Sequence, residues 1–369
     1  MICARCGHDS KAKERSGDVC PNCTGRFAFP SGSQFTDRAF ATAIEAVSAS
    51  GHLRWNLEHL YYELCRKLEK RGKLRRKIVA VALALVLSAL ALICLVNFGI
   101  QLADSQWGIS VVLAVGSAAF GYLSFITWKR VARPTGPRFV ALQRGIFDAY
   151  WCRWQEVHGS PQGLIVRRES KLPQRPVESD IGDYSFDRAV ICDQPSTVDL
   201  LLANNFHFEN NCAVLSITGY PAGPFETVRA MLKRNPRLQV FALHDASPEG
   251  CAMANRLARD PAWFHGGVPV TDVGLRPRHS PPFQGLLRVN TESVTPGQGI
   301  SEEEATWLSQ CTLELAAIRP EQVLKRLYRA LNNKPDDGDG GTSGSMVIYD
   351  NDSFAADASD SDSGADSFG

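Results

Sequence analysis

The sequence predicts an α/β domain with a parallel sheet and helices on both faces, joined to a small four-cysteine module and a transmembrane helical hairpin. Three observations support this prediction. Two C-x-x-C pairs lie within the first 23 residues, two long uncharged apolar runs follow, and short apolar segments alternate with helical patterns beyond residue 136. Strands that alternate with helices are typical of parallel sheets covered on both faces.

The charge of the chain is unevenly distributed. Lys and Arg total 40 against 39 Asp and Glu, yet residues 335–369 hold nine Asp and no Lys or Arg. Residues 1–334 therefore carry 40 basic and 30 acidic residues, a net charge of +10. A mildly basic body permits nucleic acid or anionic lipid as partners without requiring either. The tail 335–369, rich in Asp, Ser and Gly, is predicted to be disordered.

The first module carries four cysteines in two pairs. Cys3 and Cys6 form one C-x-x-C pair, and Cys20 and Cys23 form the second, with thirteen residues between them. Each pair can form a knuckle that directs two thiolates at one tetrahedral ion, and four thiolates without His or carboxylate suit structural zinc. A redox pair or an iron site are the alternatives. Residues 1–29 resemble the zinc ribbons at the N-termini of many bacterial proteins, which bind nucleic acid or protein, or simply fold around their metal.

Residues 30–77 are predicted to be helical and to end in a basic run. A first helix starts at Thr36, and a break follows near Ser50 and Gly51. A second helix carries leucines at 53, 57, 60, 64 and 68, which form one apolar stripe that we expect to pack against the first helix. Residues 66–77 then hold eight basic residues and one acid.

Residues 78–128 are predicted to form two transmembrane helices. The runs 78–103 and 109–128 contain no charged residue, and each is about as long as the roughly 20 residues that span a bilayer. Basic residues flank both outer ends and the connecting loop has only an acid, so the positive-inside rule predicts that both termini are cytoplasmic. The architecture favours the inner membrane of a bacterium. Ser117 and Gly121 form a small-xxx-small pair that would allow close packing. A buried hairpin of a soluble domain is the alternative.

Residues 136–334 are predicted to form the main soluble domain. A helical pattern opens it at 136–159, and helices over 301–318 and 320–333 close it, the first with Ser301 as its N-cap. The expected strands are 163–166, 188–192, 213–218, 239–244 and 268–274, and the expected helices between the middle strands are 196–205, 224–235 and 249–260.

Two acids and one Gly-Pro turn follow these strands in a recognisable order. The first strand of the core ends on Asp193, the second leads through Gly219 and Pro221 into a helix with Arg229, and the third ends on Asp245 before Ser-Pro-Glu-Gly. Over residues 186–320 this order resembles the Toprim domain, most closely that of the topoisomerase VI A subunit and its meiotic break-forming relatives. Such a domain has a parallel sheet and a site for Mg or Mn.

The resemblance implies roles for individual residues. Asp193 stands where the family has a Glu, Asp245 matches the first acid of its Asp-x-Asp, and Ser247 replaces the second. Glu249 is two residues beyond the expected place, and Gly250 matches the glycine that lets the helix approach closely. A site built on Asp193, Asp245 and Glu249 would be weakened, because a hydroxyl is a poorer magnesium ligand than a carboxylate. Substrate contacts are expected from Gly219, Arg229 and Gly250.

The sequence leaves three functions open. The family's Tyr nucleophile lies on an upstream winged helix, which this chain replaces with the cysteine module and the membrane hairpin, so DNA cleavage is not implied. The first hypothesis is a membrane-anchored binding or regulatory protein that recognises nucleic acid, a nucleotide or other small molecule, or a protein partner. The second is a membrane-anchored, metal-dependent nuclease or phosphotransfer enzyme, and the third is a scaffold. His244 is expected to be a structural, hydrogen-bonded residue.

Overall fold

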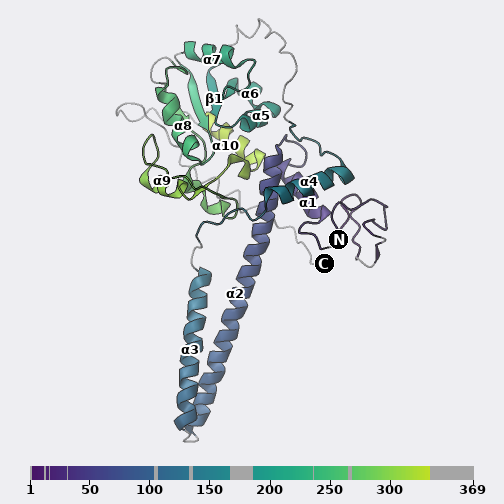
Figure 1. Ribbon diagram of the computed structural model, residues 1–369, viewed down its shortest axis with the longest axis vertical. Helices are drawn as coiled ribbons and strands as arrows, with labels where there is room; N and C mark the ends of the chain where they lie inside the picture. Colours follow the sequence, from purple (N-terminus) through teal and green to yellow (C-terminus); the bar gives the residue numbers. More distant parts are fainter. Residues whose placement is uncertain are drawn as a thin grey trace. The chain divides into compact units, whose positions relative to one another are not determined.

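The computed structural model describes residues 2–11, 14–15, 17–30, 32–103, 107–132, 136–166, 186–235, 237–264 and 268–332. The chain divides into two compact units, one from residues 1–65 and 139–369 and one from residues 66–138 (Figure 1). The acidic tail and the loop between the two apolar runs lie outside the described residues.

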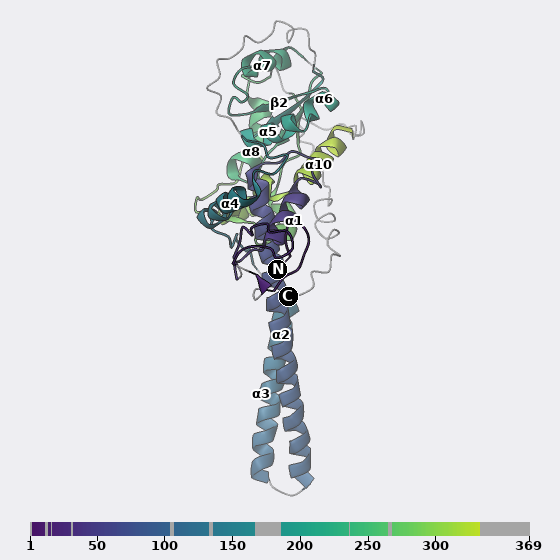
Figure 2. The ribbon, with the colours of Figure 1, turned by 90° about the vertical axis from the view of Figure 1, so that its right-hand side faces the viewer.

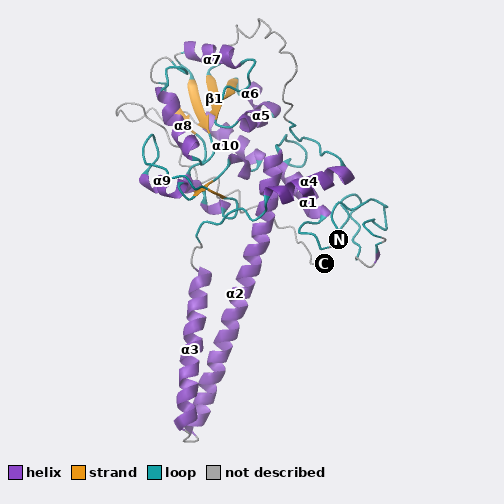
Figure 3. Ribbon diagram, viewed as in Figure 1, coloured by secondary structure: helices purple, strands orange, loops and turns teal. Residues whose placement is uncertain are grey.

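The first unit contains the predicted parallel sheet. Its strands, which are orange in Figure 3, are β1 (Arg188–Cys192), β2 (Cys212–Ser216), β3 (Gln239–Leu243) and β4 (Val270–Asp272). They lie in the order β2-β1-β3-β4. All three pairings are parallel, and Val190 faces Val214 on one side and Phe241 on the other. The chain first moves from β1 to β2 and then back across to β3, so the strand order reverses between β1 and β3. Ligands bind at such a reversal point in open α/β sheets.

Helices cover both faces of this sheet. The face of Ala189 and Ile191 packs against buried side chains of α7 (Phe225–Arg234) and α8 (Pro248–Arg259). Successive strand residues point to opposite faces, so the alternate residues Val190 and Cys192 face the other layer. That layer contains α5 (Pro195–Ala203), which lies against β1 and β2, and α6 (Phe206–Glu209), which lies against β2 (Figure 2).

Several of the predicted elements are shorter in the structure, and three of them differ markedly. The expected strand 163–166 makes only an isolated bridge between Leu164 and Trp55. The expected helix 301–318 ends early, because α9 (Glu302–Leu308) is followed by β6 (Cys311–Thr312), which pairs with β5 (Arg288–Val289). Of the predicted helix 136–159, only α4 (Arg144–His158) is helical. Before α4, Phe139 forms an isolated β-bridge with Leu287. The predicted closing helix is present as α10 (Pro320–Asn332).

An aromatic cluster joins the N-terminal segments to α4. The helix α1 (Asp37–Val47) is separated from α2 (Leu57–Ala103) by the predicted break. The carboxylate of Asp37 accepts hydrogen bonds from the amides of Ala28 and Phe29 and lies 2.8 Å from His158 Nε2. Trp154 of α4 stacks on Phe40 with ring centroids 4.8 Å apart. The segment after the cysteine module is thus fixed to α1 and α4.

The second unit is a helical hairpin of α2 from residue 66 and α3 (Trp107–Ala132). Both helices are long and apolar enough to cross a membrane, and only 6% of each apolar window is buried. The less exposed positions of α2 recur at 84, 87, 91, 94 and 98, a spacing of three and four that is typical of a helix–helix contact face. On this face the Ser88 and Ser124 hydroxyls lie 2.8 Å apart, and Ser124 is buried. Most large apolar side chains point outward, as expected in lipid.

Candidate functional site: an acid pair beside a charged cavity

Two acids meet at the point where the strand order reverses. Asp193 follows β1 and Asp245 lies two residues beyond β3, so the parallel pairing of β1 with β3 brings them to the same edge. The amide of Asp245 donates a hydrogen bond of 2.7 Å to Asp193 Oδ2. Asp193 Oδ1 is enclosed and has no hydrogen-bond partner among the described residues. Asp245 Oδ1 accepts a hydrogen bond of 2.6 Å from the amide of Leu315.

Burial and mutual repulsion disfavour two negative charges at this edge. Burial raises the pKa of Asp193 above its usual range. Burial also raises the pKa of Asp245 well above its usual range, and the neighbouring charge of Asp193 raises it further. Two carboxylates that destabilise each other's charge are stabilised by a proton or by a cation. The pair has the donor chemistry of a site for a hard divalent cation, which binds through one or two carboxylates, water and ligand phosphate.

A cavity of about 570 Å³ opens beside Asp245. Its volume lies within the range of roughly 300–1,000 Å³ that is typical of small-molecule sites. The walls come from four parts of the first unit: the start of α2, the start of α4, the first turn of α5, and the segments around β5 and β6. The lining residues are Asn56, Glu58, His59, Tyr61, Arg144, Gln194, Ser196, Thr197, Leu200, Asp245, Arg288, Glu314, Leu315 and Ala316.

Two arginine–glutamate pairs line this cavity. Arg144 holds Glu58 with two hydrogen bonds of 2.5 and 2.7 Å, and its guanidinium lies 5.1 Å from the ring centre of Tyr61. Arg288 binds Glu314 at 2.7 Å and donates from Nε to the Tyr62 hydroxyl at 2.9 Å. Both arginines are therefore held in place by fixed partners while facing the cavity.

Glu314 reaches the acid pair through an irregular segment. Ala246 and Leu313 form an antiparallel bridge with hydrogen bonds of 2.8 and 3.1 Å. This bridge and the bond from the amide of Leu315 bring Glu314 close enough for its charge to raise the pKa of Asp245. Burial raises the pKa of Glu314 itself, although Arg288 opposes the shift. Asp245 and Glu314 thus both line this side of the cavity.

The two tyrosines beside the cavity are not activated. The Tyr61 hydroxyl donates to the carbonyl of Leu142 at 2.7 Å, and burial raises the pKa of Tyr61 to about 12. Burial also raises the pKa of Tyr62, whose side chain is 1% exposed. A tyrosine nucleophile needs its phenolate to form readily, and this environment opposes that charge.

A buried ionic network holds the backbone at Asp245 in place. His244 Nδ1 donates to the carbonyl of Asp245 at 2.7 Å, and Nε2 donates to Asp272 at 2.9 Å. Asp272 also binds Arg276 at 2.7 Å. Burial lowers the pKa of His244, but Asp272 outweighs this effect, so the net shift is upward and favours the doubly protonated imidazole. A Cβ on Gly274 would lie 2.5 Å from the His244 ring, so this contact requires glycine.

The residues predicted from the Toprim resemblance have different environments. Ser247 caps α8 by accepting the amide of Gly250 at 3.0 Å, so its hydroxyl serves the helix. Gly250 is tightly packed, because a Cβ there would lie 2.3 Å from the carbonyl of Asp245. Glu249 is exposed and is not among the residues that line the cavity. Arg229 pairs with Glu226 on α7, also outside the cavity lining.

Gly219 lies in a turn after β2 with a φ of +87°, and a Cβ there would meet no atom within 4 Å. Its contribution to the structure is therefore the left-handed backbone, which glycine adopts without strain. The acid pair is thus the part of the expected site that the fold brings together, while Gly219, Arg229 and Glu249 lie apart from the cavity lining.

Sequence reasoning missed the residues that complete the cavity. Glu58 and Arg144 belong to segments that were expected to be a separate helical region or an unremarkable helix. Arg288 lies on the two-residue strand β5, and Glu314 lies two residues beyond the two-residue strand β6, so neither belongs to a segment with a periodic pattern. One signal was present: Arg288 and Glu314 are charged residues inside otherwise apolar stretches, which is typical of a buried ion pair.

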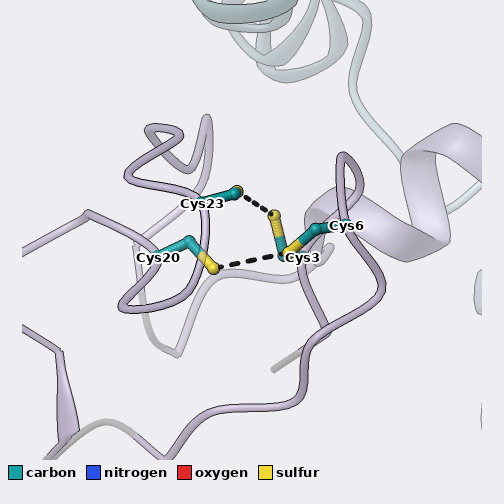
Figure 4. A group of neighbouring side chains, drawn as sticks. All are labelled: Cys3, Cys6, Cys20 and Cys23. Carbon is teal, nitrogen blue, oxygen red and sulfur yellow. Dashed lines mark hydrogen bonds between the residues drawn. The ribbon is translucent and has the colours of Figure 1, made fainter.

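The four cysteines of the first module form a compact cluster. All four Sγ atoms lie within 4.8 Å of one another, and the pairs Cys3–Cys23 and Cys6–Cys20 are 3.7 Å apart (Figure 4). Four sulfurs at about 2.3 Å from a tetrahedral zinc would be about 3.8 Å apart. The cluster therefore has the size and donor set of a structural zinc site.

The two knuckles that carry these cysteines have the same backbone pattern. In the first, the amide of Gly7 donates to the carbonyl of Cys3; in the second, the amide of Thr24 donates to that of Cys20. Gly7 and Thr24 both have positive φ, of 71° and 54°. The backbone hydrogen bond with His8 lowers the pKa of Cys6 to about 6, which favours a thiolate.

Comparisons with known proteins gave no relative. No protein-family model, curated protein or solved structure matches this chain. The function is therefore argued from the geometry of the cavity, the acid pair and the cysteine cluster.

Proposed function

We propose that this chain is a membrane-anchored binding protein whose Toprim-like α/β domain holds a phosphate-bearing ligand, a nucleotide or nucleic acid, through a divalent cation. One observation carries the proposal: Asp193 and Asp245 meet at the reversal point of a parallel sheet, directly beside a cavity of about 570 Å³ lined by two arginines. This is where open α/β sheets bind ligands.

The charges of the cavity make the cation necessary. Its ionisable lining comprises Glu58, Asp245 and Glu314 against Arg144 and Arg288, and the pKa of His59 is lowered to about 4 by burial. Three acids against two cations leave the cavity without a net positive charge. A divalent cation at the acid pair would reverse this balance and create a field that attracts phosphate. Phosphate binding is therefore expected to depend on Mg²⁺ or Mn²⁺.

Recognition without cleavage fits the surrounding residues. The hydroxyl of Ser247 caps a helix, Glu249 lies outside the cavity, and Tyr61 donates its proton to a backbone carbonyl. A phosphoryl-transfer site of the Toprim kind uses its carboxylates to stabilise the transition state through metal. Because the described residues beside the cavity include one acid pair and no activated nucleophile, we assign this domain a binding role.

The other parts of the chain serve localisation and folding in this proposal. The two apolar helices anchor the protein in the inner membrane of a bacterium with both termini in the cytoplasm, because Lys and Arg flank both outer ends of the hairpin. Zinc bound by the four cysteines of the N-terminal module stabilises the fold of that module. To test this orientation, single cysteines would be added at each terminus and in the loop 104–106 of the protein, and their labelling would be measured in intact cells.

The decisive experiment is a calorimetric titration of Mn²⁺ into the full-length, zinc-loaded protein in lipid nanodiscs. Asp245→Asn is the test variant, because it keeps an acceptor for the amide of Leu315 but removes the charge. Asp260→Asn, at the exposed C-cap of α8, is the matched control. We expect one saturable site in the wild type and the control, and none in Asp245→Asn. Absence of binding to the wild type at millimolar Mn²⁺ would overturn the proposal.

An enzymatic role is the second candidate, and one observation favours it. The enclosed Asp193 Oδ1 has no hydrogen-bond partner among the described residues, which is the state of a ligand atom that awaits a metal. A metal-dependent nuclease would cleave labelled single- or double-stranded DNA in Mn²⁺, and Asp193→Asn would abolish the cleavage. Ligand binding without turnover over many hours would exclude this candidate and leave the binding role.

A further inference from the structure

The first turn of α5 opens into the cavity and lacks a side-chain cap. Gln194, the N-cap residue, makes no capping hydrogen bond, and Pro195 at the first helical position has no amide to donate. The amide of Ser196 makes no hydrogen bond among the described residues. The positive end of a helix dipole and an available amide thus face the cavity, a combination that binds anions.

The hydroxyl of Thr197 is a second, independent indication of a ligand. Thr197 is only 7% exposed, lines the cavity, and its hydroxyl has no hydrogen bond among the described residues. A helical threonine ordinarily bonds a carbonyl three or four residues earlier. Three other helical threonines follow this rule, with bonds from Thr42 to Ala39, from Thr127 to Ser124 and from Thr306 to Glu302. Thr227, the third residue of α7, makes no such bond among the described residues, but it is exposed to solvent, whereas Thr197 is not.

The carbonyls within reach of Thr197 have other donors. The carbonyl of Gln194 already accepts the amides of Thr197 and Val198, at 3.1 and 3.4 Å. The carbonyl of Asp193 accepts the Ser216 hydroxyl at 3.4 Å. The Thr197 hydroxyl is not among the fully enclosed polar atoms without a partner, so it is accessible from the cavity and can donate to a ligand there.

We propose that the first turn of α5 is the phosphate subsite of this cavity, with the Ser196 amide and the Thr197 hydroxyl donating to one phosphate group of the ligand. The inference rests on the proposed function and adds to it where the phosphate lies. Asp193 lies two residues before α5, so one phosphate can contact both a cation at the acid pair and the helix N-terminus. Arg144 and Arg288, in the same lining, supply positive charge for the rest of an anionic ligand.

The test uses one substitution and a control at the equivalent helical position. Thr197→Val removes the hydroxyl and keeps the shape of the side chain. Thr227 is the third residue of α7, as Thr197 is of α5, both precede a valine, and Thr227 is exposed outside the cavity lining, so Thr227→Val is the matched control. Inorganic phosphate is titrated calorimetrically into the full-length, Mg²⁺-saturated protein in nanodiscs of uncharged lipid, after the thermal midpoint confirms that each variant is folded.

We expect Thr197→Val to weaken phosphate binding about tenfold or more, because a hydrogen bond to a charged group is lost, while Thr227→Val binds as the wild type does. Magnesium affinity should be the same in all three proteins. Equal phosphate affinity of Thr197→Val and the control would overturn the subsite and leave the proposed function standing. A wild type that binds neither magnesium nor phosphate would overturn the proposed function, and the subsite with it.

Discussion

The amide of Asp245 donates to the carboxylate of Asp193 across 2.7 Å, so the backbone that follows β3 holds the acid that follows β1. This contact keeps the two carboxylates together whether or not a cation is present. Their mutual repulsion therefore lowers the free energy of unfolding of the metal-free protein, and this effect can be measured.

Removing one charge of the pair should stabilise the metal-free protein. The pKa of Asp245 is raised in the folded state, chiefly by burial. A raised carboxyl pKa means that stability falls as the pH rises above the unfolded value of 3.8. Asp245→Asn should therefore raise the free energy of unfolding at pH 7.5 by roughly 0.5–2 kcal/mol in excess chelator. The gain should vanish near pH 4; an equal gain at both pH values would contradict this account.

His59 should make the first unit sensitive to mild acid. The residue is buried, its Nδ1 accepts the amide of Asn56 at 3.3 Å, and burial lowers its pKa to about 4 from 6.5. A lowered histidine pKa contributes stability above 6.5 that is lost as the pH falls toward 4, up to about 3 kcal/mol. His59→Asn keeps an acceptor for Asn56 and should reduce the acid dependence of urea unfolding. His52→Asn, at an exposed position, should leave it unchanged.

Gly274 should tolerate no side chain. A methyl group there would overlap the His244 ring at 2.5 Å, and the ring is fixed by Asp272 and by the carbonyl of Asp245. Gly274→Ala should lower stability by about 3 kcal/mol or more, the range of severe overpacking. At Gly223 a Cβ meets nothing within 4 Å, so Gly223→Ala should change thermal unfolding little. Similar midpoints for the two variants would show that the His244 contact is looser than described.

Metal loss from the cysteine module should disturb the aromatic cluster behind it. Phe27 packs with Cys3 and Cys20, and the next two residues are held by Asp37. Cys20→Ser should abolish the single zinc measured by atomic absorption and reduce the near-ultraviolet circular dichroism of the stacked Trp154. Cys152→Ser, which removes an exposed cysteine of α4, is the control and should preserve both signals. A zinc-free protein with the wild-type spectrum would show that the aromatic cluster does not depend on the metal site.

The helical hairpin of α2 and α3 can be trapped by a new disulfide. A Cβ added at Gly116 would lie 3.7 Å from the Cys94 sulfur, close to the geometry that a disulfide requires. Gly116→Cys should therefore cross-link to Cys94 in isolated membranes on oxidation, and mass spectrometry of the joined peptides would detect it. Gly121→Cys, where a Cβ meets nothing within 4 Å, should not cross-link. Equal cross-linking at both positions would contradict the described register.

The strands of the sheet could be predicted from the sequence because their pattern is local. The cavity could not, because it depends on contacts between distant residues. Strands β1, β2 and β3 are short apolar runs with an acid or a turn after them, and that pattern is local. The cavity instead depends on pairs such as Arg144 with Glu58, which are 86 residues apart. Hydrogen bonds of this kind leave no periodicity, so Glu314 appeared to belong to a long helix. The acid pair was predictable because parallel strands end at one edge of their sheet.

The helix α4 has consequences for how the cell could control this protein. Its fifteen residues form a rod of about 22 Å, with Arg144 at the cavity and His158 against Asp37 at the other end. Loss of the metal site should disturb the contact between His158 and Asp37. The resulting movement of α4 should displace Arg144 at the cavity. Oxidation of the cysteines or loss of zinc should therefore lower the affinity of the cavity for the proposed ligand, although neither event touches the cavity itself.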